Sequence, residues 1–104
     1  MTVEVADNPE LERYEARVDG ELAGFAQYHV DGGRITIFHA EVDPAFGGRG
    51  VGSRLAGSAL DDVRAQGLEL VPSCPFIAAY VRSHPEPYLG IVAESLRERV
   101  MSGR

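Results

Sequence analysis

A glycine-rich stretch in the middle of the chain, from Pro44 to Ser53, constrains the fold more than any other segment. It holds four of the chain's twelve glycines within six residues, after a run rich in β-branched residues and before an amphipathic helical pattern. Glycines permit positive φ angles and a close approach of the backbone to a ligand. The unpaired N–H groups of a helix's first turn, with the positive end of the helix dipole, attract anions. The sequence therefore predicts a strand, a phosphate-binding turn and a helix.

The residues before this stretch predict an antiparallel meander of three or four strands. Strand-like alternation or β-branched runs occur at 3–5, 14–18, 22–30 and 34–42. Sequences rich in Asp, Asn and Gly, which favour turns, separate these runs at 7–10, 19–20 and 31–33. Strands joined by short turns pair antiparallel, so we expect the first half of the chain to form one sheet.

The residues after the glycines predict a crossover connection and further helices. A helix, a short strand and two more helices are expected at about 50–66, 68–71, 75–84 and 93–100. The first helix carries one apolar stripe, and Gly67 ends it. Strand, helix and strand in this length imply a crossover, so the short strand lies parallel to an earlier one. The predicted fold class is α/β of the α+β type, with helices packed on a mixed sheet.

Composition narrows the class of protein. With 104 residues, a single domain at 1–104 is expected, and the net charge of −6 without a basic cluster argues against nucleic-acid binding. An acidic chain is compatible with a cationic amine substrate. No apolar run is long enough for a membrane span, and no metal is expected because the three histidines lie apart. One cysteine and no secretory start predict a cytoplasmic location.

Two common phosphate loops do not match the glycine-rich stretch. The Walker pattern ends in Gly-Lys-Ser/Thr, and this chain has no lysine. The dinucleotide pattern needs a third glycine three residues after the second. Gly50 and Gly52 would place that third glycine at position 55, which is Leu55. The glycine-rich stretch is therefore expected to bind a phosphate ligand of another class.

The stretch resembles the acyl-CoA pyrophosphate loop of the GNAT N-acetyltransferases, whose usual form is Arg/Gln-x-x-Gly-x-Gly/Ala. The segment 47–52 matches this form at Gly50 and Gly52 and departs from it at Gly47, where the usual Arg or Gln is missing. That departure removes a side-chain donor from the loop. The backbone N–H contacts remain available, because they need only the turn and the start of the helix.

The resemblance extends to a small, truncated GNAT-like family of about this length. It runs from about Val5 to Leu89, and the tail 90–104 lies outside it. The segments that carry it are Asp7–Glu10, Arg13–Glu15, His39–Val42, Val71–Phe76, Tyr80 and His84–Glu86. Members of this family lack the two N-terminal helices that help full-length GNAT enzymes hold the acceptor, and this chain likewise opens on strands.

The resemblance implies acetyl-CoA as the acyl donor. The backbone near Val42 would pair with the pantetheine arm as an added strand. The amides of the loop would hold the pyrophosphate, with Arg49 or Arg54 adding positive charge. The expected CoA-binding residues are Val42, Gly47, Gly48, Arg49, Gly50, Val51, Gly52 and Ser53.

Two residues of the segment after the short strand are candidates for chemistry. The position of Tyr80 matches the tyrosine that protonates the leaving CoA thiolate in GNAT enzymes, and the alternative is a core aromatic. Cys74 precedes Pro75 at the expected N-cap, where the helix dipole favours a thiolate. It is predicted either to accept the acetyl group or to line the acceptor pocket, and the alternative is a buried structural cysteine.

Two further candidates lie on the strand before the loop. Glu41 and His39 are two residues apart and share one face of the strand, so either can take a proton from an amine. The alternative for both is a solvated or ion-paired surface role. His84, beside Pro85, is expected to end a helix.

The predicted function is transfer of the acetyl group of acetyl-CoA to an unidentified amine. The direct route uses Glu41, backbone N–H donors and Tyr80, and the other route first acetylates Cys74. The main alternative is a non-catalytic acyl-CoA-binding or interaction module, and a plain scaffold would leave the glycine cluster unexplained. The chain is expected to be a monomer or a homodimer.

Overall fold

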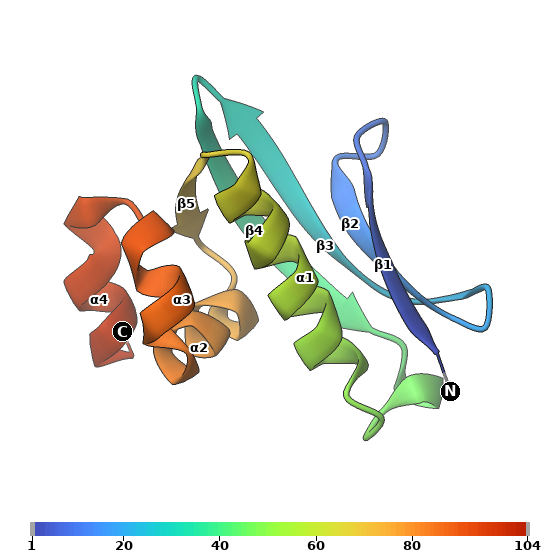
Figure 1. Ribbon diagram of the computed structural model, residues 1–104. Helices are drawn as coiled ribbons and strands as arrows, with labels where there is room; N and C mark the ends of the chain where they lie inside the picture. The colour runs from blue at the N-terminus through green and yellow to red at the C-terminus, as the bar shows by residue number, and fades with distance from the viewer. Residues whose placement is uncertain (1, 104) are drawn as a thin grey trace.

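A computed structural model describes residues 2–103, and within them the chain forms a five-stranded mixed sheet with helices packed against it (Figure 1). The strands are β1 (Val3–Asn8), β2 (Arg13–Val18), β3 (Glu21–Asp31), β4 (Arg34–Val42) and β5 (Glu69–Pro72). The α-helices are α1 (Val51–Ala65), α2 (Pro75–Ser83), α3 (Pro85–Tyr88) and α4 (Arg97–Ser102). Short 3-10 turns, η1 (Pro44–Phe46), η2 (Leu89–Ile91) and η3 (Glu94–Leu96), connect them.

The sheet topology confirms the predicted fold class. The strands lie in chain order, and β1 to β4 pair antiparallel as a meander. The crossover through α1 brings β5 parallel to β4. Within residues 2–103 no helix is both long enough and apolar enough to span a bilayer.

Three element boundaries differ from the expectation. The first strand extends to Asn8, because Asp7 and Asn8 pair with β2 instead of turning, and the turn lies at 9–12. A short helix that was not predicted, α3, begins at Pro85, because proline is tolerated in the first turn of a helix. The terminal helix is a 3-10 turn followed by α4, which includes Met101.

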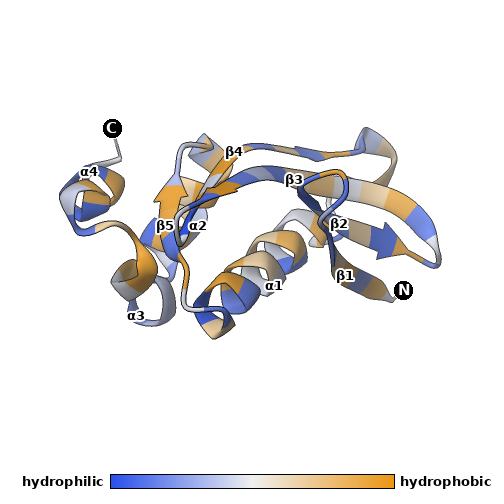
Figure 2. Ribbon diagram, turned by 90° about the horizontal axis from the view of Figure 1, so that it is seen from above, coloured by the Kyte–Doolittle hydropathy of each residue, from blue (hydrophilic) through white to orange (hydrophobic). Residues whose placement is uncertain are grey.

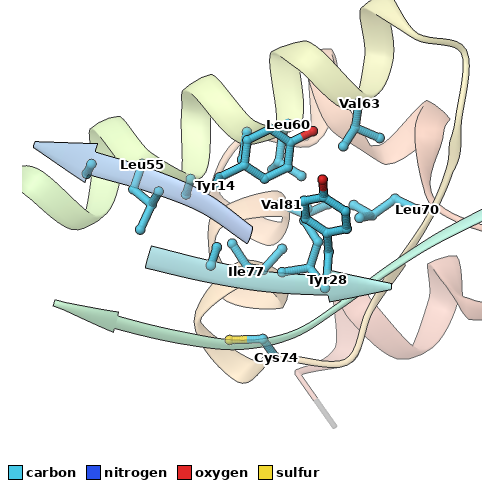
Figure 3. Close-up of a cluster of buried hydrophobic side chains, with 14 of the residues drawn as sticks. Tyr14, Tyr28, Leu55, Leu60, Val63, Leu70, Cys74, Ile77 and Val81 are labelled. Atoms are coloured by element: carbon cyan, nitrogen blue, oxygen red, sulfur yellow. The ribbon is translucent and has the colours of Figure 1, made fainter. Parts of the chain in front are cut away.

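One face of the sheet holds the core. Helix α1 buries its predicted apolar stripe against the sheet and α2: Leu55, Ala56, Ala59, Leu60 and Val63, and Val51 is buried with them. Ile77 and Val81 of α2 join the same cluster (Figure 3). Figures 1 and 2 show α1 on this side, and within residues 2–103 no helix covers the opposite face of β2, β3 and β4.

Three tyrosine hydroxyls form hydrogen bonds between different elements of the fold. The hydroxyls of Tyr14 and Tyr88 donate to Asp62 and Asp61 of α1, each at 2.7 Å. Burial and then the acceptor carboxylates raise the pKa of both phenols, that of Tyr88 to about 12. The Tyr28 hydroxyl donates to Asp7 of β1, also at 2.7 Å. The Tyr14 bond thus joins α1 to the sheet, the Tyr88 bond joins α1 to α3, and the Tyr28 bond joins β3 to β1.

Replacing Tyr14 with phenylalanine is expected to lower the free energy of unfolding by about 1–2 kcal/mol, because a buried hydrogen bond to a charged acceptor is lost. Asp62 keeps its bond from Gln66, so the carboxylate is not left without a donor. Urea unfolding measures the change. Tyr80→Phe is the matched control, since its hydroxyl donates no hydrogen bond within residues 2–103. Equal stability of the two variants would contradict this role of Tyr14.

Candidate functional site

Strand β4 separates from β5 halfway along its length. The two strands pair only between residues 34–37 of β4 and 69–72 of β5. A β-bulge follows at Phe38, which is the extra residue because Tyr28 lies opposite Ile37 and Gln27 lies opposite His39. Bulges increase the local twist of a strand and bend it. Beyond Phe38 the β4 edge that faces away from β3 has no strand partner within residues 2–103, so it offers backbone groups to a ligand.

The glycine-rich turn joins this open edge to α1. After β4, Asp43 is the N-cap of η1, and its carboxylate accepts a hydrogen bond from the N–H of Ala45 at 2.9 Å. Gly48 and Gly50 have φ angles of 76° and 73°, the left-handed region that favours glycine. Gly47 has φ −61°, so its backbone does not require glycine.

Gly50 is the N-cap of α1, and the first turn of the helix contains no acidic residue. The N–H groups of Val51, Gly52 and Ser53 lie in this turn, where no preceding turn supplies carbonyl acceptors. The anion site that the sequence predicts would consist of these N–H groups and the positive end of the α1 dipole.

Gly52 lies where three elements meet. A Cβ built on it would lie 3.0 Å from Cζ of Phe76 and 3.6 Å from Cγ2 of Val42. Val42 ends β4, Gly52 belongs to the first turn of α1, and Phe76 belongs to the first turn of α2. The structure therefore brings the predicted residues Val42 and Gly52 together, and any side chain larger than hydrogen at position 52 would fill the space between them.

Phe76 was missed as a site residue by the sequence reasoning. The residue is 41% exposed although its side chain is large and aromatic. It lies outside the buried stripe of α2 formed by Ile77 and Val81. The sequence signal for such a residue is an aromatic side chain that adjoins the apolar stripe of a helix but lies on a different face of that helix.

The two loop arginines differ in role. The Arg54 guanidinium donates to the carbonyl of Val3 at 3.3 Å, so it links α1 to β1. The side chain of Arg49 is exposed at the glycine turn. Of the two, Arg49 is the one placed at the turn itself.

Tyr80 belongs to α2, and its phenol approaches α1. A Cβ built on Gly57 of α1 would lie 2.8 Å from its hydroxyl oxygen, so the absence of a side chain at position 57 admits the phenol. The ring stacks on His84 with centroids 4.2 Å apart and lies 5.9 Å from the ring of Tyr88. His84 is the C-cap of α2, as expected of a residue that ends a helix.

Cys74 is the N-cap of α2, the position that the sequence predicted. Its N–H donates to the carbonyl of Ile37 at 3.0 Å, at the point where β4 and β5 separate. The residue is only 4% exposed and belongs to the core cluster (Figure 3). The structure thus places Cys74 near the open edge of β4 and buries its thiol.

Glu41 and His39 lie on the uncovered face of the sheet. The His39 Nε2 and Glu41 Oε1 atoms are 3.2 Å apart, and the two side chains are 47% and 60% exposed. An open groove of about 540 Å³ lies beside Glu41 at the ends of β3 and β4. Its lining residues are Leu22, Ala23, Gly24, Phe25, Glu41, Val42, Asp43 and Pro44.

Val42 connects the two halves of the site. It lines the groove, and its side chain also approaches Gly52 of the glycine turn. Val42 therefore borders both the groove and the start of α1.

Curated relatives of the chain include acetyltransferases. A mycothiol acetyltransferase from Clavibacter michiganensis subsp. michiganensis is 38% identical over 71 residues, which cover 62% of this chain and 23% of that protein. The Xenopus tropicalis protein NATD1 is 28% identical over 88 residues, with 83% and 81% covered. Human protein NATD1 is 39% identical over 61 residues, with 58% and 54% covered. The chain thus spans only about a quarter of the mycothiol acetyltransferase.

Two solved structures are also similar to the chain. Ard1 from Thermoplasma volcanium matches with a TM-score of 0.49 and 28% identity, covering 55% of this chain and 39% of that one. Nourseothricin acetyltransferase matches with a TM-score of 0.47 and 30% identity, covering 72% of this chain and 47% of that one.

The family model described as GCN5-related N-acetyl-transferase matches residues 13–91, which is most of the chain. The chain therefore belongs to the GCN5-related N-acetyltransferase (GNAT) family.

Proposed function

We propose that this GNAT domain binds acetyl-CoA at the glycine turn and transfers the acetyl group to an amine. The observation that carries the proposal is the meeting of Val42, Gly52 and Phe76 at the start of α1. It combines an open strand edge, an anion-binding helix start and an exposed aromatic side chain. CoA presents a pyrophosphate and an extended amide-containing arm, which these features complement.

Different residues of the site would hold different parts of acetyl-CoA. The N–H groups of residues 48–53 would hold the pyrophosphate, and Arg49 adds positive charge at the turn. The backbone near Val42 would pair with the pantetheine arm, since this edge of β4 has no strand partner within residues 2–103. The thioester supplies an activated acetyl carbon, and its end would lie near the point where β4 and β5 separate.

The direct route of transfer agrees best with the geometry. Glu41 takes a proton from the amine, and backbone N–H groups stabilise the carbonyl oxygen as it gains charge. Tyr80 gives its proton to the departing sulfur. The other predicted route requires Cys74 to attack the thioester, and the 4% exposure of this residue disfavours that attack.

A non-catalytic acyl-CoA-binding module is the second candidate. It is favoured by Gly47, which stands where related loops carry Arg or Gln, and by the sheet face that no helix covers within residues 2–103. Both candidates bind acetyl-CoA, and only the enzyme releases CoA when an amine is supplied.

Calorimetric titration with acetyl-CoA, followed by a free-thiol assay of CoA release with a panel of amines, tests the proposal. We expect one acetyl-CoA per chain and amine-dependent release of CoA. Binding without release by any amine would favour the module. Absence of binding at millimolar acetyl-CoA would contradict both candidates. Intact mass spectrometry decides the route, because an acetyl adduct that disappears in Cys74→Ser would contradict the direct one.

Gly57→Ala tests the placement of Tyr80. The added methyl group would meet the phenol oxygen, so the Tyr80 side chain must move while its chemistry is unchanged. Displacing a catalytic group in this way is expected to lower kcat roughly 10-fold. The free energy of unfolding should change by less than about 1 kcal/mol, because alanine is the better helix former. An unchanged kcat would show that the position of the phenol does not matter.

A further inference from the structure

The chain after residue 91 helps to build a second groove. This groove has a volume of about 530 Å³ and lies between β5, α2 and the tail that ends in α4. The family model ends at residue 91, whereas Leu96, Arg99, Val100 and Gly103 of the groove lie beyond it. Figures 1 and 2 place α4 at the end of the molecule remote from β1. Membership of the GNAT family therefore does not imply this groove.

Helix α2 presents different sides to the groove and to α1. Pro75, Ala78 and Arg82 line the groove, and their spacing of three and four residues places them on one side of the helix. Phe76 and Tyr80, which approach glycines of α1, are four residues apart and lie on another side. The groove is therefore separate from the glycine turn and from the proposed acetyl-CoA site.

Two arginines line the groove, and its described lining contains no carboxylate. Nη1 of Arg82 donates to the Val100 carbonyl at 3.0 Å, which uses one of the five N–H donors of a guanidinium. Arg99 is exposed, and its guanidinium forms no hydrogen bond or ion pair with residues 2–103. By contrast, Arg13 and Arg34 each pair with a glutamate. The groove is thus cationic although the chain has a net charge of −6.

Gly103 leaves space beside the Arg82 guanidinium. The φ angle of Gly103 is 76°, in the left-handed region that favours glycine. A Cβ built there would lie 3.7 Å from Cζ and Nη1 of Arg82, so a side chain at position 103 would lie against the guanidinium. A guanidinium is weakly hydrated and pairs with a carboxylate through two parallel hydrogen bonds. A carboxylate is therefore the anion that this part of the groove fits.

The rest of the lining favours a small molecule over an extended peptide. Pro72 at the edge of β5 has no N–H, and the Leu70 carbonyl already accepts a hydrogen bond from the N–H of Ala93 at 2.9 Å. A peptide that adds to a sheet as a strand needs free main-chain groups of this kind. The apolar residues of the lining are Val71, Pro72, Pro75, Ala78, Leu96 and Val100.

We propose that this groove binds a small organic acid, with its carboxylate on Arg82 and Arg99 and its hydrocarbon chain against the apolar lining. An uncharged apolar molecule would leave the two guanidiniums without an anion, and an inorganic anion would leave the apolar lining in contact with water. The volume of about 530 Å³ is typical of small-molecule sites. The inference does not depend on acetyl transfer or on acetyl-CoA.

An NMR titration with sodium hexanoate, in the absence of acetyl-CoA, tests the site. We expect saturable shifts of the amide signals of Ala78, Arg82 and Arg99. Acetate, which lacks the chain, and 1-hexanol, which lacks the charge, should each bind at least about 10-fold more weakly. Equal binding of acetate would show an adventitious ion only, and equal binding of 1-hexanol would show a purely apolar site. Either result, or no hexanoate shift at millimolar concentration, would overturn the proposal.

Two variants locate the ligand. Arg99→Gln should weaken hexanoate binding about 10-fold, because hydrogen bonds to a charged group are lost. Ala78→Glu should abolish binding, because it places a carboxylate four residues before Arg82 and supplies the groove with an anion of its own. Glu and Arg at this spacing also stabilise a helix, so this variant should fold.

Arg64→Gln is the matched control for net charge. Arg64 is an exposed arginine of α1 that donates to the Pro87 carbonyl, and its loss changes the net charge as much as that of Arg99 does. This variant should bind hexanoate as wild type does. Equal affinity in wild type, Arg99→Gln and Ala78→Glu would overturn the proposal and leave the proposed acetyl transfer untouched.

Hydrogen exchange gives a second readout that needs no activity. A ligand held by Arg82 of α2 and Arg99 of α4 joins the two helices, so saturating hexanoate should slow amide exchange in α4. The same addition to Ala78→Glu should leave α4 unchanged. Unchanged exchange in α4 of the wild-type protein would contradict a ligand that contacts both helices.

Discussion

Replacing Tyr80 with phenylalanine should lower kcat for acetyl transfer about 100-fold, because the departing sulfur loses its proton donor. The affinity for acetyl-CoA should be unchanged. Phenylalanine retains the ring that stacks on His84 and approaches Tyr88, so the packing between α1, α2 and α3 is preserved. Free-thiol release at saturating acetyl-CoA and amine measures kcat, and calorimetry measures the affinity.

Tyr88→Phe is the matched control for this prediction. The Tyr88 hydroxyl donates to Asp61 at 2.7 Å, so its loss should lower the free energy of unfolding by about 1 kcal/mol. It should leave kcat near the wild-type value, because this hydroxyl already has an acceptor on α1. If Tyr80→Phe retained wild-type kcat, or if Tyr88→Phe lost as much, Tyr80 would not be the proton donor.

Gly52→Val is expected to weaken acetyl-CoA binding by about 100-fold or more. The valine side chain would occupy the space between Val42 and Phe76 and cover the N–H groups of the first turn of α1. Loss of about two hydrogen bonds to a charged phosphate corresponds to roughly 3 kcal/mol of binding free energy. This raises the dissociation constant about 100-fold. Calorimetric titration with acetyl-CoA measures this change.

The fold should survive the same substitution. The closest obstacle to the new side chain is the exposed ring of Phe76, which can turn toward solvent. Gly90→Val is the matched control, because a Cβ at position 90 would meet no atom within 4 Å. It should bind acetyl-CoA as wild type does. Normal affinity in Gly52→Val would show that the glycine turn is not the CoA site.

The sheet and the glycine turn were predictable because their signals are local. Alternation and turn residues define β2 to β4, and the positive φ angles at Gly48 and Gly50 follow from the glycine cluster. One prediction from local composition, a turn at Asp7 and Asn8, was wrong. Asp7 and Asn8 have turn composition, yet they extend β1, because pairing with β2 and the bond from Tyr28 outweigh their preference.

The remaining features depend on contacts that no local pattern encodes. The N-cap position of Cys74 was predictable from Pro75, but its burial follows from packing against the core. Phe25 faces away from the core, and only the register of β2 and β4 places two carboxylates beside it. The fit of the Tyr80 phenol over Gly57 likewise requires the relative placement of α1 and α2.

A crystal structure of the protein with acetyl-CoA would test the central proposal most directly. We expect the pyrophosphate oxygens to accept hydrogen bonds from backbone N–H groups of residues 48–53. The pantetheine arm should pair with the β4 edge near Val42, with the thioester within reach of the Tyr80 hydroxyl. Acetyl-CoA bound away from the glycine turn, or a thioester pointing away from both Tyr80 and Glu41, would contradict this account of the site.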